Sequence, residues 1–68
     1  MQMTPVVSSN ISSIGYEAGT LYVAFNSGGL YAYSGVPVDV YRNLMAASSH
    51  GSYLAAHVKN VYPYTRLR

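Results

Sequence analysis

The chain has 68 residues and a mass of 7.4 kDa, which allows one small domain over residues 1–68 and excludes a second, catalytic domain. Half of the residues are apolar and 9% are charged, a composition typical of a folded protein rather than a disordered one. No cysteine is present, which excludes disulfides, a thiolate nucleophile and a cysteine-based zinc site, and favours a cytoplasmic location.

The formal charge of +2 is unevenly distributed along the chain. Residues 1–38 carry only Glu17, whereas residues 39–68 carry four bases and one acid, a sum of +3. This asymmetry favours an anionic partner. The longest apolar run, residues 21–25, is far below the roughly 18 residues that a membrane helix needs, so we expect no membrane partner.

After an N-terminal segment of residues 1–9, three alternating runs separated by glycine-containing turns predict strands over residues 10–16, 20–25 and 30–34. Hairpin loops over residues 17–20 and 26–28 place the same set of side chains on one face in both strand pairs. The loop lengths matter because a slip of one residue would move every side chain of a strand to the opposite face. One face of the predicted meander then carries the larger side chains, namely Ile14, Tyr16, Leu21, Val23, Phe25, Tyr31 and Tyr33.

The opposite face carries mostly small side chains and almost no charge, with Ser13, Gly15, Tyr22, Ala24, Leu30 and Ala32 on it. Uncharged patches of this kind often mark an interface, so we expect a homo-oligomer formed through this outer sheet face. The alternative is a half-exposed sheet with ordinary scattered apolar residues.

Two helices are predicted after the meander. Pro37 and Asp39 suit the first turn of a helix over residues 37–47. Ser48 or Ser49 can cap a second helix over about residues 50–60, which Asn60 and Pro63 end. Their apolar stripes are Val40, Tyr41, Leu44 and Met45 in the first helix and Leu54, Val58 and Val61 in the second.

The expected fold is therefore α+β, a three-stranded antiparallel β-meander followed by two α-helices packed on one face. Residues 63–68 lack a helical period and are predicted to form an extended basic tail. Its tyrosines and arginines, with Tyr62 before them, could clamp a ligand by stacking and phosphate pairing, and a frayed terminus is the alternative.

Five segments in this order resemble the KTSC domain, a short bacterial module of about this length: SSNISSIGY at 8–16, LYVAF at 21–25, YAY at 31–33, SGVP at 34–37 and SSHGSYL at 48–54. The resemblance spans about residues 6–64. It implies the same fold, and it implies RNA binding because similar modules occur at the C-terminus of some lysyl-tRNA synthetases. Positions that are often basic in such modules are here Ala24, Ala32, His50 and Ser52, which favours a small anionic ligand over a long RNA strand.

Catalytic and metal sites are not predicted. Glu17 and Asp39 fall on separate elements, which disfavours paired acid–base catalysis. His50 and His57 on one helix would lie about 10 Å apart along its axis, too far to share one ion. Phosphate-loop, dinucleotide-binding and nucleophile-elbow spacings are absent, so we expect no enzyme and no cofactor.

The predicted ligand site is the start of the second helix, where free backbone N–H groups and the helix dipole favour an anion. A tyrosine there could stack on a base while histidine or lysine meets phosphate. The candidate ligand-binding residues are Ser49, His50, Gly51, Ser52, Tyr53, His57, Lys59 and Arg66.

A purely structural interpretation competes with this site. Ser49 could be only an N-cap, Gly51 could permit close packing, and Tyr53 could belong to the core. Tyr31 and Tyr33 have the same ambiguity, because an exposed pair would be a stacking platform whereas the predicted register places them beneath the helices.

The sequence therefore predicts a small non-catalytic binding module for an anionic nucleotide-type ligand. The ligand would be short single-stranded RNA or a small nucleotide, and sequestration, for example in a phage, is one way such a module could act. The alternative is a protein–protein interaction or homo-oligomeric assembly module that has no ligand.

Overall fold

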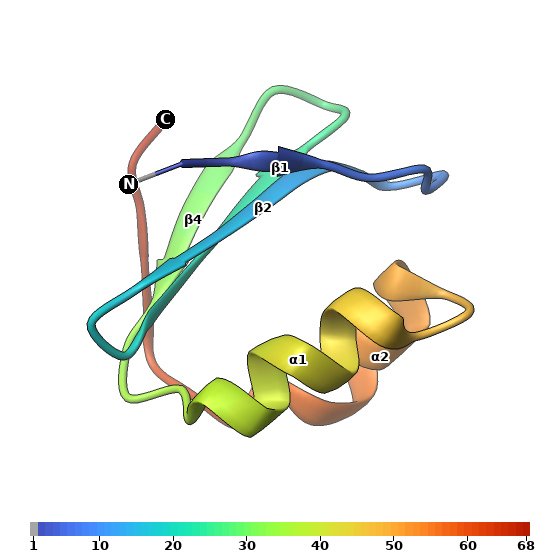
Figure 1. Cartoon of the computed structure of the whole chain (residues 1–68). Coiled ribbons are helices and arrows are strands. Elements are labelled where there is room, and N and C mark those ends of the chain that lie inside the picture. The colour runs from blue at the N-terminus through green and yellow to red at the C-terminus, as the bar shows by residue number, and fades with distance from the viewer. Residues whose placement is uncertain (1) are drawn as a thin grey trace.

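The computed structural model describes residues 2–68, so Met1 of the predicted N-terminal segment lies outside the described residues. It shows an antiparallel sheet in the order β1-β2-β3-β4-β5, with two helices across one face (Figure 1). The α+β class is thus confirmed. In chain order the elements are β1 (Thr4–Pro5), β2 (Ile11–Glu17), β3 (Thr20–Phe25), β4 (Leu30–Tyr33), α1 (Val38–Ala46), α2 (His50–His57) and β5 (Tyr64–Arg66).

The predicted strand count of three is wrong, because the described residues form five strands. Residues 4–5 of the N-terminal segment pair with β2, and residues 64–66 of the predicted basic tail pair with β4. Both added strands are too short to show an alternating pattern, and all their side chains are exposed. Backbone hydrogen bonds hold β5, including one from Ser34 N–H to the Pro63 carbonyl at 2.9 Å.

The predicted register of the meander is confirmed. Tyr16 lies opposite Leu21, and Leu21 in turn lies opposite Tyr33. Val23 of β3 likewise lies opposite Ile14 of β2 on one side and opposite Tyr31 of β4 on the other. Since directly paired residues share a face, these side chains all lie on the face that the helices cover.

The first hairpin loop is shorter than predicted but leaves this register unchanged. Glu17 pairs with Thr20, so the turn is only Ala18 and Gly19, whose φ angles are +51° and +80°. Two successive left-handed residues are the geometry of a type I′ hairpin turn. Shortening the loop from four residues to two preserves its parity, and the side chains therefore keep their faces.

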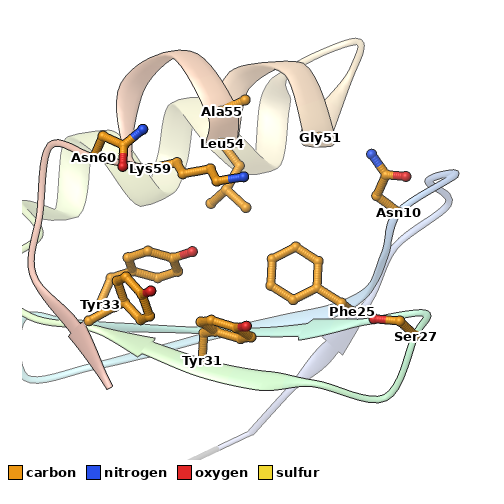
Figure 2. A pocket seen from close by; sticks show the side chains of 11 residues that line it. Asn10, Phe25, Ser27, Tyr31, Tyr33, Gly51, Leu54, Ala55, Lys59 and Asn60 are labelled. Atoms are coloured by element: carbon orange, nitrogen blue, oxygen red, sulfur yellow. The ribbon is translucent and has the colours of Figure 1, made fainter. Parts of the chain in front are cut away.

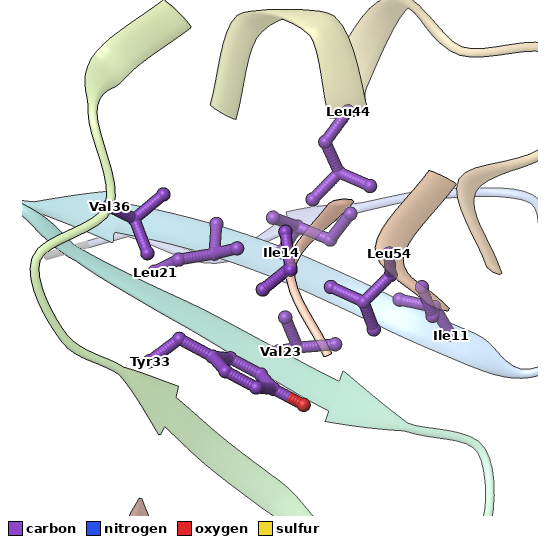
Figure 3. Packing of buried hydrophobic residues seen from close by; sticks show 9 residues of the cluster. Ile11, Ile14, Leu21, Val23, Tyr33, Val36, Leu44 and Leu54 are labelled. Atoms are coloured by element: carbon purple, nitrogen blue, oxygen red, sulfur yellow. The ribbon is translucent and has the colours of Figure 1, made fainter. Parts of the chain in front are cut away.

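The core lies between the helices and the sheet, mainly over β2 and β3 (Figure 3). Leu44 of α1 and Leu54 of α2 contribute from the helical layer, and Val58 follows directly after α2. The buried hydrophobic residues are Ile11, Ile14, Leu21, Val23, Tyr33, Val36, Leu44, Leu54 and Val58.

One predicted core position is wrong. Val61 was expected on the apolar stripe of the second helix, yet it is 59% exposed. The reason is that α2 ends at His57, three residues before the predicted end at Asn60. Asn60 then adopts φ +65°, a left-handed conformation that turns the chain toward β5 and takes Val61 out of the helical periodicity.

Two valines outside the strands and helices offer a matched test of this core. Val36 is 1% exposed and Val7 is 99% exposed. We expect Val36→Ala to lower the free energy of unfolding by about 1.5–3 kcal/mol, because it removes buried methyl groups and leaves a cavity. Val7→Ala should change it by less than about 0.5 kcal/mol. Urea denaturation measures both, and equal effects would contradict the assigned core.

Candidate functional site

A cleft of about 470 Å³ opens between α2 and the part of the sheet formed by β3, β4 and β5 (Figure 2). This volume is in the range of about 300–1,000 Å³ that small-molecule sites occupy. We call it the aromatic cleft. Its lining residues are Asn10, Phe25, Ser27, Tyr31, Tyr33, Gly51, Leu54, Ala55, Lys59, Asn60 and Tyr64.

Four aromatic rings from three adjacent strands form the floor of the aromatic cleft. The β4–β5 register places Tyr33 directly opposite Tyr64, with ring centroids 5.7 Å apart. The Tyr31 ring lies 5.3 Å from Tyr64 and 6.4 Å from Tyr33. Phe25 of β3 meets Tyr31 edge-on at 5.4 Å. The floor therefore depends on strand pairing, which brings residues about 30 positions apart into contact.

The roof of the aromatic cleft is one face of α2, where Gly51, Leu54 and Ala55 follow the helical spacing of three and four residues. Gly51 and Ala55 have little or no side chain, which leaves the space above the floor open. A Cβ atom at Gly51 would lie 3.3 Å from Asn10 Nδ2, so glycine allows the helix to approach the segment before β2 closely.

The charge of the aromatic cleft comes from bases. Lys59 lines it, and its ammonium has no ion-pair partner within residues 2–68. The Arg66 guanidinium carbon lies 5.7 Å from the centroid of the Tyr31 ring, a cation–π geometry. No aspartate or glutamate side chain lines the cleft. Asp39 lies on α1, 3.8 Å from Arg42 in an exposed i,i+3 pair.

Burial raises the pKa of Tyr33 above its ordinary value of 10.0, and the neighbouring phenols of Tyr31 and Tyr64 raise it further. The Tyr33 hydroxyl therefore stays protonated at neutral pH and can donate a hydrogen bond into the cleft.

Five of the predicted site residues lie at the start of α2 or along it, outside the lining of the aromatic cleft. Ser49 is the N-cap, and its hydroxyl accepts a hydrogen bond from Ser52 N–H at 3.3 Å, while the Ser52 side chain is exposed. The His50 Nδ1 donates to the Leu44 carbonyl at 2.8 Å and so links α2 to the end of α1. The Tyr53 and His57 rings lie 4.3 Å apart, as their i,i+4 spacing predicts.

The other three predicted residues do come together. Gly51 and Lys59 line the aromatic cleft from the helical side, and Arg66 lies over Tyr31 from β5. The four aromatic residues of the floor were not among the predicted site residues. The available signals were the alternation of Tyr31 and Tyr33 and the same alternation of Tyr64 and Arg66, which place each pair on one face of a strand.

Among the residues that the structure describes, no group of three or more histidine, cysteine, aspartate and glutamate side chains is close enough together to hold a metal ion. Within the same part of the chain, neither helix has the length and apolar character needed to cross a membrane.

These features define an α+β domain with an aromatic, basic cleft between its last helix and its sheet. The model of the KTSC domain family matches residues 7–62, and the chain belongs to this family. It is similar to the crystal structure of a KTSC domain protein from Yersinia pestis, with a TM-score of 0.94 and 35% identity over 98% of this chain and 97% of that chain.

Two curated proteins are also similar to this chain in sequence. A protein from Tsukamurella paurometabola is 39% identical over 59 residues, covering 84% of this chain and 88% of the relative. An uncharacterized protein from Stutzerimonas stutzeri is 42% identical over 53 residues, covering 75% of each chain. The family match ends before β5, so Tyr64 and Arg66 lie beyond the matched residues.

The raised pKa of Tyr33 predicts a pH dependence of stability. An unfolded tyrosine releases its proton near pH 10.0, whereas Tyr33 in the folded chain releases it only at higher pH. Within that window the folded state binds more protons, so the free energy of unfolding falls as pH rises. In urea melts from neutral pH to above pH 10.0, Tyr33→Phe should lose less stability than the wild type.

Tyr22→Phe is the matched control for this experiment, because Tyr22 pairs with Gly15 and Ala32 on the outer sheet face. If Tyr33→Phe and Tyr22→Phe follow the same alkaline profile, the pKa of Tyr33 is not raised by folding.

Proposed function

We propose that this chain is a small non-catalytic binding module for an anionic nucleotide-type ligand, either short single-stranded RNA or a small nucleotide. The proposal rests on one observation, namely a cleft floored by four aromatic rings, supplied with two bases and lined by no acidic side chain. Aromatic rings stack on the π-face of any base, and lysine and arginine bind phosphate. Sequestering the ligand is one way in which so small a module would act.

The site proposed here is shifted from the start of α2 to the aromatic cleft. Tyr31 and Phe25 are half-buried, so their rings offer surface on which a base can stack. Lys59 lines the cleft from the end of the helical layer. Arg66 lies on β5 beside the Tyr31 ring, where its Nε donates to the Arg68 backbone oxygen at 2.8 Å. The start of α2 contributes through Gly51, whose backbone borders the cleft.

This function predicts separate effects for stacking and for charge. Tyr31→Leu should weaken binding of a labelled oligouridylate by about 1–3 kcal/mol, because a stacking ring is lost. Lys59→Gln should weaken binding and also lower the slope of log K against log salt by about 0.7, because one phosphate contact is removed from a single strand. Fluorescence anisotropy across a salt series measures both quantities.

Arg42→Gln is the matched control for Lys59→Gln, since Arg42 lies on α1 beside Asp39 and away from the aromatic cleft. A thermal melt of each variant verifies that it is folded. Equal affinities and equal salt slopes for Lys59→Gln and Arg42→Gln would remove the aromatic cleft as the site.

The alternative function is a homo-oligomeric or other protein–protein assembly module without a ligand. The observation that favours it is the composition of the outer sheet face. Leu67 follows β5, its N–H donates to the Leu30 carbonyl at 2.7 Å, and its side chain is 49% exposed. By alternation from Thr65, which pairs with Ala32, Leu67 extends this nearly uncharged face beside Leu30. A cytoplasmic location accompanies both proposals as a prediction from the cysteine-free sequence.

Assembly through the outer face predicts that the mass of the wild type rises with concentration and that Leu67→Lys abolishes this rise. Val61→Lys is the matched control, because Val61 is an exposed apolar residue in the turn after α2 rather than on the sheet. Sedimentation equilibrium measures the mass. A wild type that stays monomeric at every concentration would contradict the alternative function.

A further inference from the structure

The floor of the aromatic cleft gathers three phenol groups. The rings of Tyr31, Tyr33 and Tyr64 pack against one another at centroid distances of 5.3, 5.7 and 6.4 Å. Tyr31 and Tyr64 are close enough to act electrostatically on the Tyr33 hydroxyl. Each phenol is a hydrogen-bond donor, so the floor offers a cluster of O–H groups as well as aromatic surface.

The Tyr33 hydroxyl is the most informative of the three. Its side chain is 3% exposed, and the hydroxyl has no hydrogen-bond partner among residues 2–68. Every fully buried side-chain oxygen or nitrogen in that part of the chain has a hydrogen-bond partner. Because the Tyr33 hydroxyl has none, its oxygen atom is not fully buried and must retain access to the cleft that Tyr33 lines. Buried polar groups are normally hydrogen-bonded. An open donor on an almost fully buried side chain therefore indicates where an acceptor atom of the ligand fits.

A positive charge faces this donor cluster. Figure 2 shows the Lys59 side chain reaching from the helical layer into the space above Tyr31 and Tyr33. Its ammonium has no ion-pair partner within the described chain. Arg66 adds a second cation beside Tyr31. The cluster thus combines neutral O–H donors with one lining cation, Lys59, and a second cation, Arg66, next to Tyr31, and no carboxylate side chain lines the cleft.

The chemistry of phosphate esters distinguishes the ligands that could satisfy this set. A phosphate monoester carries a charge of about −1.5 to −2 at neutral pH and presents three acceptor oxygens. A phosphodiester inside an RNA strand carries a single charge and has only two free oxygens. Two cations and three O–H donors therefore match a monoester better in both charge and number of acceptors.

Building on the nucleotide-binding function proposed above, we infer that the aromatic cleft selects a nucleotide bearing a phosphate monoester, with the phosphate between Lys59 and the Tyr33 hydroxyl and the base stacked toward Tyr31 and Phe25. The monoester belongs either to a free nucleotide or to the phosphorylated end of an RNA chain. Internal phosphodiesters of a strand bind more weakly.

Isothermal titration calorimetry of the full chain with four probes tests this selection. The probes are adenosine, adenosine 5′-monophosphate, the diadenosine dinucleotide without a terminal phosphate, and the same dinucleotide with a 5′-phosphate. We expect the two monoesters to bind at least about tenfold more tightly than their unphosphorylated counterparts, because charge-assisted hydrogen bonds are roughly twice as strong as neutral ones. A monophosphate that binds without the phosphorylated dinucleotide assigns a free nucleotide, and the reverse assigns an RNA end.

A variant pair links the selection to the hydroxyl. Tyr33→Phe keeps the ring and removes only the donor, so it should reduce the preference for the monophosphate over adenosine by about fivefold. Adenosine itself should bind within about twofold of its wild-type affinity, because it does not need the donor. Tyr22→Phe on the outer sheet face is the matched control and should leave the preference unchanged.

The outcomes separate the two proposals. If the unphosphorylated dinucleotide binds as tightly as the phosphorylated one, monoester selection is overturned while nucleotide binding stands. An unchanged preference in Tyr33→Phe likewise overturns the assigned phosphate position. If none of the four probes and no oligouridylate binds, the nucleotide-binding function fails, and the inference fails with it.

Discussion

The alternation of side chains along β4 is the constraint on which both the core and the cleft depend. Tyr31 and Tyr33 point to the face that the helices cover, because β4 pairs with β3 in one fixed register. The same two residues set the partners on the other side, where Tyr33 meets Tyr64 and Tyr31 meets Arg66. A slip of one residue would move both rings to the outer face. It would remove Tyr33 from the core and the floor from the cleft together.

The cleft exists because the helical layer is too small to cover the whole sheet. α1 has nine residues and α2 has eight, and their buried leucines pack mainly over β2 and β3. A chain of this size buries only about 60% of its unfolded surface, so an uncovered strip is the expected result. Here that strip is aromatic rather than aliphatic. Aromatic rings tolerate partial exposure because their flat faces can accept a ligand and tyrosine has a polar end.

At the start of α2, side chains that were predicted to bind a ligand instead make hydrogen bonds within the fold. Ser49 caps the helix, and the His50 ring holds the end of α1 through the Leu44 carbonyl. The Ser49 hydroxyl satisfies the Ser52 N–H, which has no intrahelical partner at the helix start. The His50 ring gives the Leu44 carbonyl a second donor beside the Ala47 N–H. The residues left over for a ligand are therefore those on the cleft side of the helix, where Gly51 and Ala55 leave space and Lys59 supplies charge. Helical spacing shows which residues share a face of α2, but the position of the sheet is needed to know which of these faces borders the cleft.

Local sequence determined the fold class, the register of β2, β3 and β4, and the two helix starts, because turn parity and side-chain periodicity act over a few residues. Residue type likewise marked Gly51, Lys59 and Arg66 as ligand candidates. The return of residues 64–66 to pair with β4 depended on tertiary structure, since three exposed residues carry no periodic burial signal and their backbone bonds form only once β4 is in place. That pairing brings Tyr64 and Arg66 onto Tyr33 and Tyr31, which made the cleft a property of the folded chain rather than of any one segment.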